Sequence, residues 1–141
     1  ALRHLHLQGK KVLLLGAGGA AKAVAQYAAQ QGAQLFITNR DFEKAQHLAQ
    51  KVGGQAIAQN EIPPDTFLIV NATPVQDPAG EFPPQAYRFD LYYNPRQTAF
   101  LQGAQPGYAI SGLDMFVAQA VEQVFLWSGQ RLSPELYLNS L

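Results

Sequence analysis

The stretch "KVLLLGAGGAA" constrains the fold more than any other part of the sequence. A short apolar run, residues 11–15, leads directly into Gly16 and Gly18, and the alanine-rich stretch 20–32 then follows and ends in a glycine. An apolar run of this length predicts a buried strand, and the stretch after it predicts a helix that is capped at its C-terminus by glycine. A strand, a glycine turn and a helix in this order predict the start of a parallel βαβ unit.

The rest of the chain continues this alternation of short apolar runs and helical patterns. Further strands are expected at 33–39, 66–71, 87–93 and 107–111, and further helices at 41–54, from near Pro95 to 104, and at 112–129. The fold class is therefore expected to be α/β, a Rossmann-like three-layer fold with a mainly parallel sheet and helices on both faces. We interpret residues 1–10 as the end of an interdomain helix or a linker, and residues 11–141 as one nucleotide-binding domain.

Composition and charge exclude several classes of function. The formal net charge is zero, so neither nucleic acid nor a membrane surface is an expected partner, and any bound anion must be held by local groups. The absence of cysteine excludes disulfides, thiolate metal sites and a cysteine nucleophile. The histidines have no metal-like spacing with acidic residues, so no metal site is expected. Without an apolar segment of signal-peptide or membrane-spanning length, a cytoplasmic location is expected.

The glycine turn is a candidate site for a pyrophosphate. Glycine lets the backbone approach a phosphate closely, and the amides at the N-terminus of the following helix carry a partial positive charge. The candidate residues are Gly16, Ala17, Gly18, Gly19 and Ala20. The alternative is a tight strand-to-helix turn that binds nothing.

The residues after the second expected strand bear on which dinucleotide would bind. Enzymes that use NAD usually carry an acid here for the ribose hydroxyls, but the first charged residue in "LFITNRDFEK" is Arg40. A guanidinium can bind the 2'-phosphate of NADP bidentately, and Lys44 is within reach of the same phosphate. Asp41 either caps the next helix or binds a ribose hydroxyl. NADP is the expected cofactor and NAD a weaker alternative; a solvated pair of surface cations is the other interpretation.

Several motifs together indicate a family. The segments "GAGGAAKAV", "NRDFEKAQHLA", "VNATP", "DLYYNPRQT" and "GLDMFVAQAVEQVFLWSG" occur in the order and spacing of the cofactor-binding domain of shikimate dehydrogenases, and the chain resembles that family over about 9–129. The resemblance implies an oxidoreductase that reversibly reduces 3-dehydroshikimate to shikimate with NADPH. That reaction is a step of aromatic amino acid biosynthesis, on the route to chorismate.

The resemblance also implies roles for individual residues. Asn39, Arg40 and Lys44 match residues that hold the 2'-phosphate; Ala72, Thr73 and Pro74 match residues that line the cofactor; Leu91, Gly112 and Met115 match residues along the nicotinamide; and Tyr93 and Gln119 match residues that reach the substrate. Met115 and Gln119 lie four residues apart, away from the apolar stripe of their expected helix, so a ligand or a second domain is expected to cover them. The alternative is an isolated exposed methionine and, at Tyr93, an edge tyrosine.

The catalytic groups of the family are not expected in this chain. Shikimate dehydrogenases carry their catalytic lysine and aspartate in an N-terminal substrate-binding domain, which is absent from this chain, so no catalytic residue is assigned and the chain alone is expected to be inactive. Asp41 stands where the family frequently has threonine, which keeps open a quinate/shikimate dehydrogenase paralogue that uses NAD or NADP. A non-catalytic NADPH-binding module is the remaining alternative.

Overall fold

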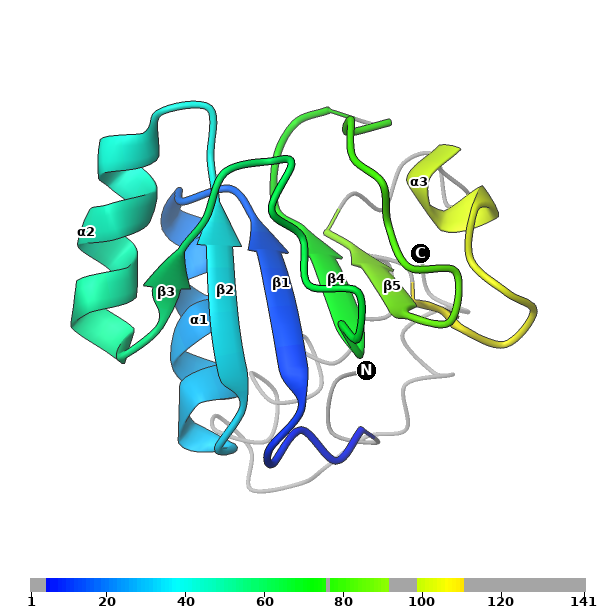
Figure 1. Cartoon of the computed structure of the whole chain (residues 1–141), viewed down its shortest axis with the longest axis horizontal. Helices are drawn as coiled ribbons and strands as arrows, with labels where there is room; N and C mark the ends of the chain where they lie inside the picture. Colours follow the sequence, from blue (N-terminus) through cyan, green and yellow to red (C-terminus); the bar gives the residue numbers. More distant parts are fainter. Residues whose placement is uncertain (1–4, 76, 92–98, 111–141) are drawn as a thin grey trace, which may run out of the picture.

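A parallel sheet forms the centre of the molecule (Figure 1). The computed structural model describes residues 5–75, 77–91 and 99–110. Its six strands pair in the order β3-β2-β1-β4-β5-β6, and every pair is parallel. The strands are β1 (Lys11–Leu15), β2 (Gln34–Thr38), β3 (Gln55–Ala56), β4 (Leu68–Asn71), β5 (Tyr87–Asp90) and β6 (Ala109–Ile110). The strand order reverses between β1 and β4, which places a ligand-binding crevice outside the carboxyl ends of these two strands.

The helices lie on both faces of this sheet. They are α1 (Gly19–Gln30), α2 (Phe42–Val52) and α3 (Ala99–Gln102). Helices α1 and α2 pack on one face, where α1 lies behind the sheet in Figure 1, and α3 packs on the other. The expected α/β fold, Rossmann-like with a parallel sheet between helical layers, is thereby confirmed. In the described ranges, no helix combines the length and the apolar character that crossing a bilayer requires.

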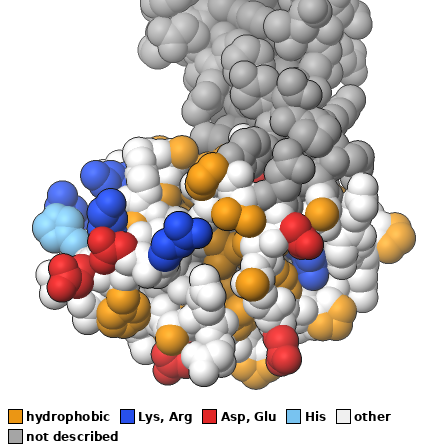
Figure 2. Space-filling view, turned by 90° about the horizontal axis from the view of Figure 1, so that it is seen from above, with side chains coloured by type: hydrophobic (Ala, Val, Ile, Leu, Met, Phe, Trp, Pro, Cys, Tyr) orange, Lys and Arg blue, Asp and Glu red, His pale blue; other side chains and the backbone are white. Residues whose placement is uncertain are grey.

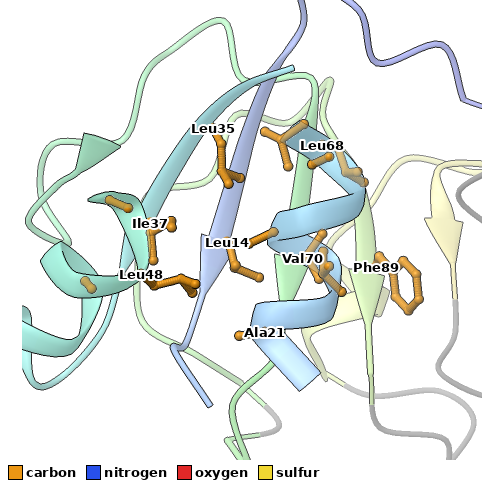
Figure 3. Close-up of a cluster of buried hydrophobic side chains, with 14 of the residues drawn as sticks. Leu14, Ala21, Leu35, Ile37, Leu48, Leu68, Val70 and Phe89 are labelled. Atoms are coloured by element: carbon orange, nitrogen blue, oxygen red, sulfur yellow. The ribbon is translucent and has the colours of Figure 1, made fainter. Parts of the chain in front are cut away.

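Alternating strand residues divide the core into two clusters. Leu14, Ile37 and Val70 project from neighbouring strands toward α1 and α2, where they meet small and branched side chains such as Ala21 and Leu48 (Figure 3). The strand residues next to these, such as Leu13 and Ile69, point to the α3 face of the sheet, because successive side chains of a strand alternate between faces. The strands are thus buried on both sides, which explains their continuous apolar runs.

The second cluster attaches α3 to the sheet through an arginine. Leu13 and Ile69 pack with Phe100 of α3 on this face. The guanidinium of Arg88 lies 5.2 Å and 5.3 Å from the ring centroids of Phe82 and Phe100, and its Nη1 donates to the Phe100 carbonyl at 2.9 Å. Burial lowers the pKa of Arg88, and the charge of Asp77 acts in the opposite direction. Arg88 therefore joins β5, α3 and the loop before β5.

The helix ends follow the expected capping chemistry. The helix predicted at 41–54 is α2, whose N-cap is Asp41 and whose C-cap is Gly53, at φ +76°. The C-cap of α1 is Gln31, and Gly32, the glycine expected to cap this helix, follows it with φ +80°. Residues with a side chain rarely adopt these positive φ values, so glycine is required at both C-terminal positions.

The remaining expectations differ from the structure mainly in length. The strands predicted at 33–39, 66–71, 87–93 and 107–111 are shorter in the structure, and β3 was not predicted. Of the helix predicted from near Pro95, the described part is α3; the helix predicted at 112–129 lies outside the described residues. In the N-terminal segment, residues 8–9 form a turn, and Leu7 is buried in the α1 side of the core. The domain boundary after residue 10 stays a prediction.

Candidate functional site

A pocket opens at the carboxyl ends of the central strands, where parallel α/β sheets bind ligands. It has a volume of about 610 Å³ and is lined by the segments that follow β1, β2 and β4, together with the loops before β4 and β5. Figure 2 looks down on this end of the molecule. Lysine and arginine side chains, with acidic side chains among them, gather over the α2 side of the view, and hydrophobic side chains lie nearer its centre. The charged residues of the described lining are Arg40 and Asp77, and the lining also includes apolar side chains such as Ile62 and Val75.

The turn after β1 forms the floor of the pocket. Its lining includes Gly16, Ala17 and Gly18. Gly16 has φ +112°, and its amide donates to the Thr38 carbonyl of the neighbouring strand at 2.9 Å. A Cβ on Gly16 would lie only 3.1 Å from the Ala72 carbonyl oxygen. Glycine is therefore required here by the backbone conformation and by the close approach of the loop after β4.

Gly18 is glycine for a different reason. It is the N-cap of α1 with φ −82°, a conformation open to any residue, and no described protein atom lies within 4 Å of a Cβ built on it. Among the described residues, no side chain caps α1 at this end, and the first turn of the helix carries no acidic residue. The helix therefore begins beside the pocket with the partial positive charge of its N-terminus uncompensated by these side chains. A phosphate placed there would use the space that a side chain would otherwise fill.

The segment after β2 supplies a cation to the site. Asn39 and Arg40 both line the pocket, and Arg40 is exposed. The Asn39 Nδ2 donates to the Asp41 carbonyl at 3.1 Å, and the Asp41 Oδ1 accepts from the Glu43 amide at 3.1 Å. Asp41 therefore caps α2, one of the two roles expected for it; a contact with a ribose stays a prediction. Lys44, in the first turn of α2, is exposed but is not part of the pocket lining.

The loop after β4 forms the wall opposite Arg40. Ala72, Thr73 and Pro74 line the pocket, and Val75 extends this wall; their contact with a cofactor stays a prediction. The buried side chain of Asn71 holds the loop: its Nδ2 donates to the Val75 carbonyl at 2.7 Å, and its Oδ1 accepts from the amide and the hydroxyl of Thr73. Hydrogen bonds from Asn71 therefore hold residues 73–75 of this loop.

Sequence reasoning missed part of the lining. Gln59 and Ile62 come from the loop before β4, whereas Asp77, Pro78 and Ala79 continue the loop that begins after β4. A smaller pocket of about 490 Å³ continues past Gln59, Ile62 and Ala79 to Glu81. The loop before β4 has no periodic pattern that would relate it to the glycine turn, and only the sheet order brings the two to the same edge.

The other candidate residues lie around the pocket or outside the described ranges. Gly19 and Ala20 form the exposed first turn of α1 beside the lining residues. Leu91 follows β5, where its amide donates to the Asn71 carbonyl at 3.0 Å. Tyr93, Gly112, Met115 and Gln119 lie outside the described residues. Within the described part of the chain, no group of three or more acidic or histidine side chains is placed to hold a metal ion.

Comparison with known proteins agrees with this geometry. The family model described as "Shikimate / quinate 5-dehydrogenase" matches residues 1–71, half of the chain, and the model of the shikimate 5'-dehydrogenase C-terminal domain matches residues 112–136. The chain belongs to the shikimate dehydrogenase family. The resemblance inferred from the motifs in the sequence is thereby confirmed.

Individual members of this family differ from the chain in length. The shikimate dehydrogenase (NADP(+)) of Oleidesulfovibrio alaskensis is 40% identical over 85% of the chain, which spans 49% of that relative. The bifunctional 3-dehydroquinate dehydratase/shikimate dehydrogenase of Arabidopsis thaliana is 38% identical over 93% of the chain, which spans 24% of it. The shikimate 5-dehydrogenase of Thermus thermophilus, solved with NADP(H) and shikimate, superposes with a TM-score of 0.77 at 32% identity, covering 95% of this chain and 55% of that one. The chain thus spans at most about half the length of these relatives.

Proposed function

We propose that this chain is the NADP-binding part of a shikimate dehydrogenase, which reversibly reduces 3-dehydroshikimate to shikimate with NADPH. The observation that carries the proposal is the pocket that joins the glycine turn, Arg40 and the loop 72–75. The acid nearest to Arg40 in sequence, Asp41, is engaged at the N-terminus of α2. The exposed charge on the β2 side of the pocket is therefore a cation, as a 2'-phosphate requires.

Each part of the pocket has a role in this proposal. The uncapped N-terminus of α1 and the open space at Gly18 fit a pyrophosphate. Arg40 takes the 2'-phosphate, with Asn39 beside it and Lys44 in reach from the first turn of α2. A charge-assisted hydrogen bond contributes about 1.5–3 kcal/mol, so Arg40 is expected to favour NADP over NAD by about tenfold to a hundredfold.

The nicotinamide and the substrate would lie toward β5. We place Leu91, Gly112 and Met115 along the nicotinamide and Tyr93 and Gln119 at the substrate, on the strength of the family motifs alone. When bound, the cofactor supplies the hydride chemistry; the protein orients it and holds its phosphates. The catalytic lysine and aspartate of the family are predicted to belong to a domain outside these 141 residues, because the chain matches only about half of its relatives.

Two alternative functions would use the same pocket. One differs from the proposal in the cofactor that it accepts, and the other in having no catalytic domain. The matching family model covers quinate as well as shikimate dehydrogenases, so a paralogue that accepts NAD is one of them. A non-catalytic NADPH-binding module is the other.

Calorimetric titration of the chain with NADPH and with NADH tests the proposal. We expect NADPH to bind at least about tenfold more tightly, and the chain alone to show no turnover of shikimate. Equal affinities would favour the dual-cofactor paralogue, and absence of binding would contradict the assigned site.

A further inference from the structure

Asn71 is a buried polar residue at the carboxyl end of a central strand, and its side chain faces the loop rather than the pocket. It is the last residue of β4, has no exposed surface, and is absent from the residues that line the pocket. Its carbonyl accepts from the Leu91 amide at 3.0 Å, and the next amide, that of Ala72, donates to the Leu15 carbonyl at 2.9 Å. The backbone at Asn71 is therefore fixed by strands on both sides.

The hydrogen bonds of Asn71 require an amide side chain in one orientation. The Thr73 amide can only donate, so the atom that faces it at 3.1 Å must be the Asn71 oxygen. The Val75 carbonyl can only accept, so the atom that faces it at 2.7 Å must be the Asn71 nitrogen. An ionised aspartate would lack the donor, and a leucine would lack both groups.

The hydroxyl of Thr73 belongs to the same network. It donates to the Asn71 Oδ1 at 2.6 Å and accepts from the Val75 amide at 3.2 Å. Its single proton is thus directed to Asn71, while its methyl group lies on the Gly16 side, 3.3 Å from where a Cβ on that glycine would be. The loop consequently presents mainly apolar groups to the pocket.

We infer that Asn71 is a positioning residue for cofactor binding: its amide holds the loop 72–75 against the glycine turn in the conformation that forms the pocket wall. The inference rests on the proposed function for one point, that the ligand of the pocket is NADP. The hydrogen bonds that hold the loop do not depend on that proposal.

The variant Asn71→Asp gives a test that a general loss of stability would not mimic. Burial raises the pKa of a carboxyl group, so the introduced acid is expected to be protonated in mild acid and ionised in mild base. The protonated acid can donate to the Val75 carbonyl, as the native amide does, whereas the ionised acid repels that carbonyl. Asn71→Leu, which has a similar volume and does not titrate, is the matched control.

The binding measurement is a titration with NADP⁺, which withstands mild acid, at about pH 5 and pH 8. The ratio of the Kd of each variant to that of the native chain removes the effect of the cofactor's own phosphate titration. We expect Asn71→Asp to bind about tenfold or more weakly at the higher pH and to recover most of this loss at the lower pH, while Asn71→Leu binds weakly at both. A ratio for Asn71→Asp that does not change with pH would overturn the inference.

The loop can also be followed without cofactor. In NMR spectra of Asn71→Asp, the amide signals of Thr73 and Val75 are expected to shift or broaden at pH 8 and to return to their native positions at pH 5. Native positions at both values would overturn the inference. If the loop responds in this way but the native chain does not bind NADP⁺, the proposed function fails and the role of Asn71 in holding the loop stands.

Discussion

Gly16 and Ala72 bring the floor of the pocket into contact with the wall that follows β4. A Cβ on Gly16 would lie 3.1 Å from the Ala72 carbonyl oxygen, and the backbone of Gly16 has φ +112°. The first residue after β1 and the first residue after β4 therefore pack with no room for a side chain between them. This contact is made at the point where the strand order reverses, between β1 and β4.

Replacing Gly16 is expected to harm both stability and cofactor binding. Gly16→Ala forces a side chain into an unfavourable φ and against the Ala72 carbonyl, at a cost of about 1–3 kcal/mol or more in the free energy of unfolding. Urea denaturation measures this loss, and titration with NADPH measures the change in the pocket.

Gly53→Ala is the matched control for this variant. Gly53 has φ +76°, no described atom within 4 Å of a Cβ built on it, and a place at the far end of α2. It should lose about 1–2 kcal/mol from its backbone conformation alone and keep its affinity for NADPH. Equal effects of the two substitutions on binding would show that the Gly16–Ala72 contact does not shape the pocket.

Gly18→Ala is expected to separate binding from stability. The conformation of Gly18 suits any residue, and the added methyl group would meet no described protein atom. As an N-cap substitution it should change the free energy of unfolding by less than about 1 kcal/mol. The methyl group would occupy the space assigned to the pyrophosphate, so the Kd for NADPH should rise by about tenfold or more. An unchanged Kd would place the pyrophosphate elsewhere.

Lys44→Gln examines the outer part of the phosphate site. Lys44 is exposed in the first turn of α2, where a cation is not favoured by the helix dipole, so its removal should change stability by less than about 0.5 kcal/mol. We expect the affinity for NADPH to fall several-fold, by less than for an Arg40 variant, and the affinity for NADH to stay the same. A loss for both cofactors would mean that Lys44 does not act on the 2'-phosphate.

The sequence predicted best what local chemistry determines. The bounds 11–15 of the first strand match β1, and the capping residues Asp41 and Gly53 mark the ends of α2, because an apolar run and a cap are each defined by neighbouring residues. The two residues of β3, by contrast, have no strand pattern of their own. They extend the sheet because Gln55 pairs with Phe36, a contact that the sequence does not reveal.

The same distinction holds for the candidate site. Gly16, Arg40 and Thr73 could be proposed from the sequence because each follows a strand in a known motif, and all three line the pocket. Gln59 and Ile62 were missed, because only the sheet order brings their loop to the pocket. Asn71 carried a usable signal, since an asparagine two residues before a threonine at a strand end favours a side-chain-to-backbone turn.

The most direct test of the account is the cofactor preference of Arg40→Ala, measured by calorimetric titration with NADPH and NADH. Lys51→Ala removes the same charge from the last turn of α2 and serves as the control. We predict that the native chain and the control prefer NADPH by about tenfold or more, and that Arg40→Ala loses this preference by binding NADPH more weakly while NADH binding is unchanged. If Arg40→Ala kept the preference of the native chain, Arg40 would not bind the 2'-phosphate and the assigned site would be wrong.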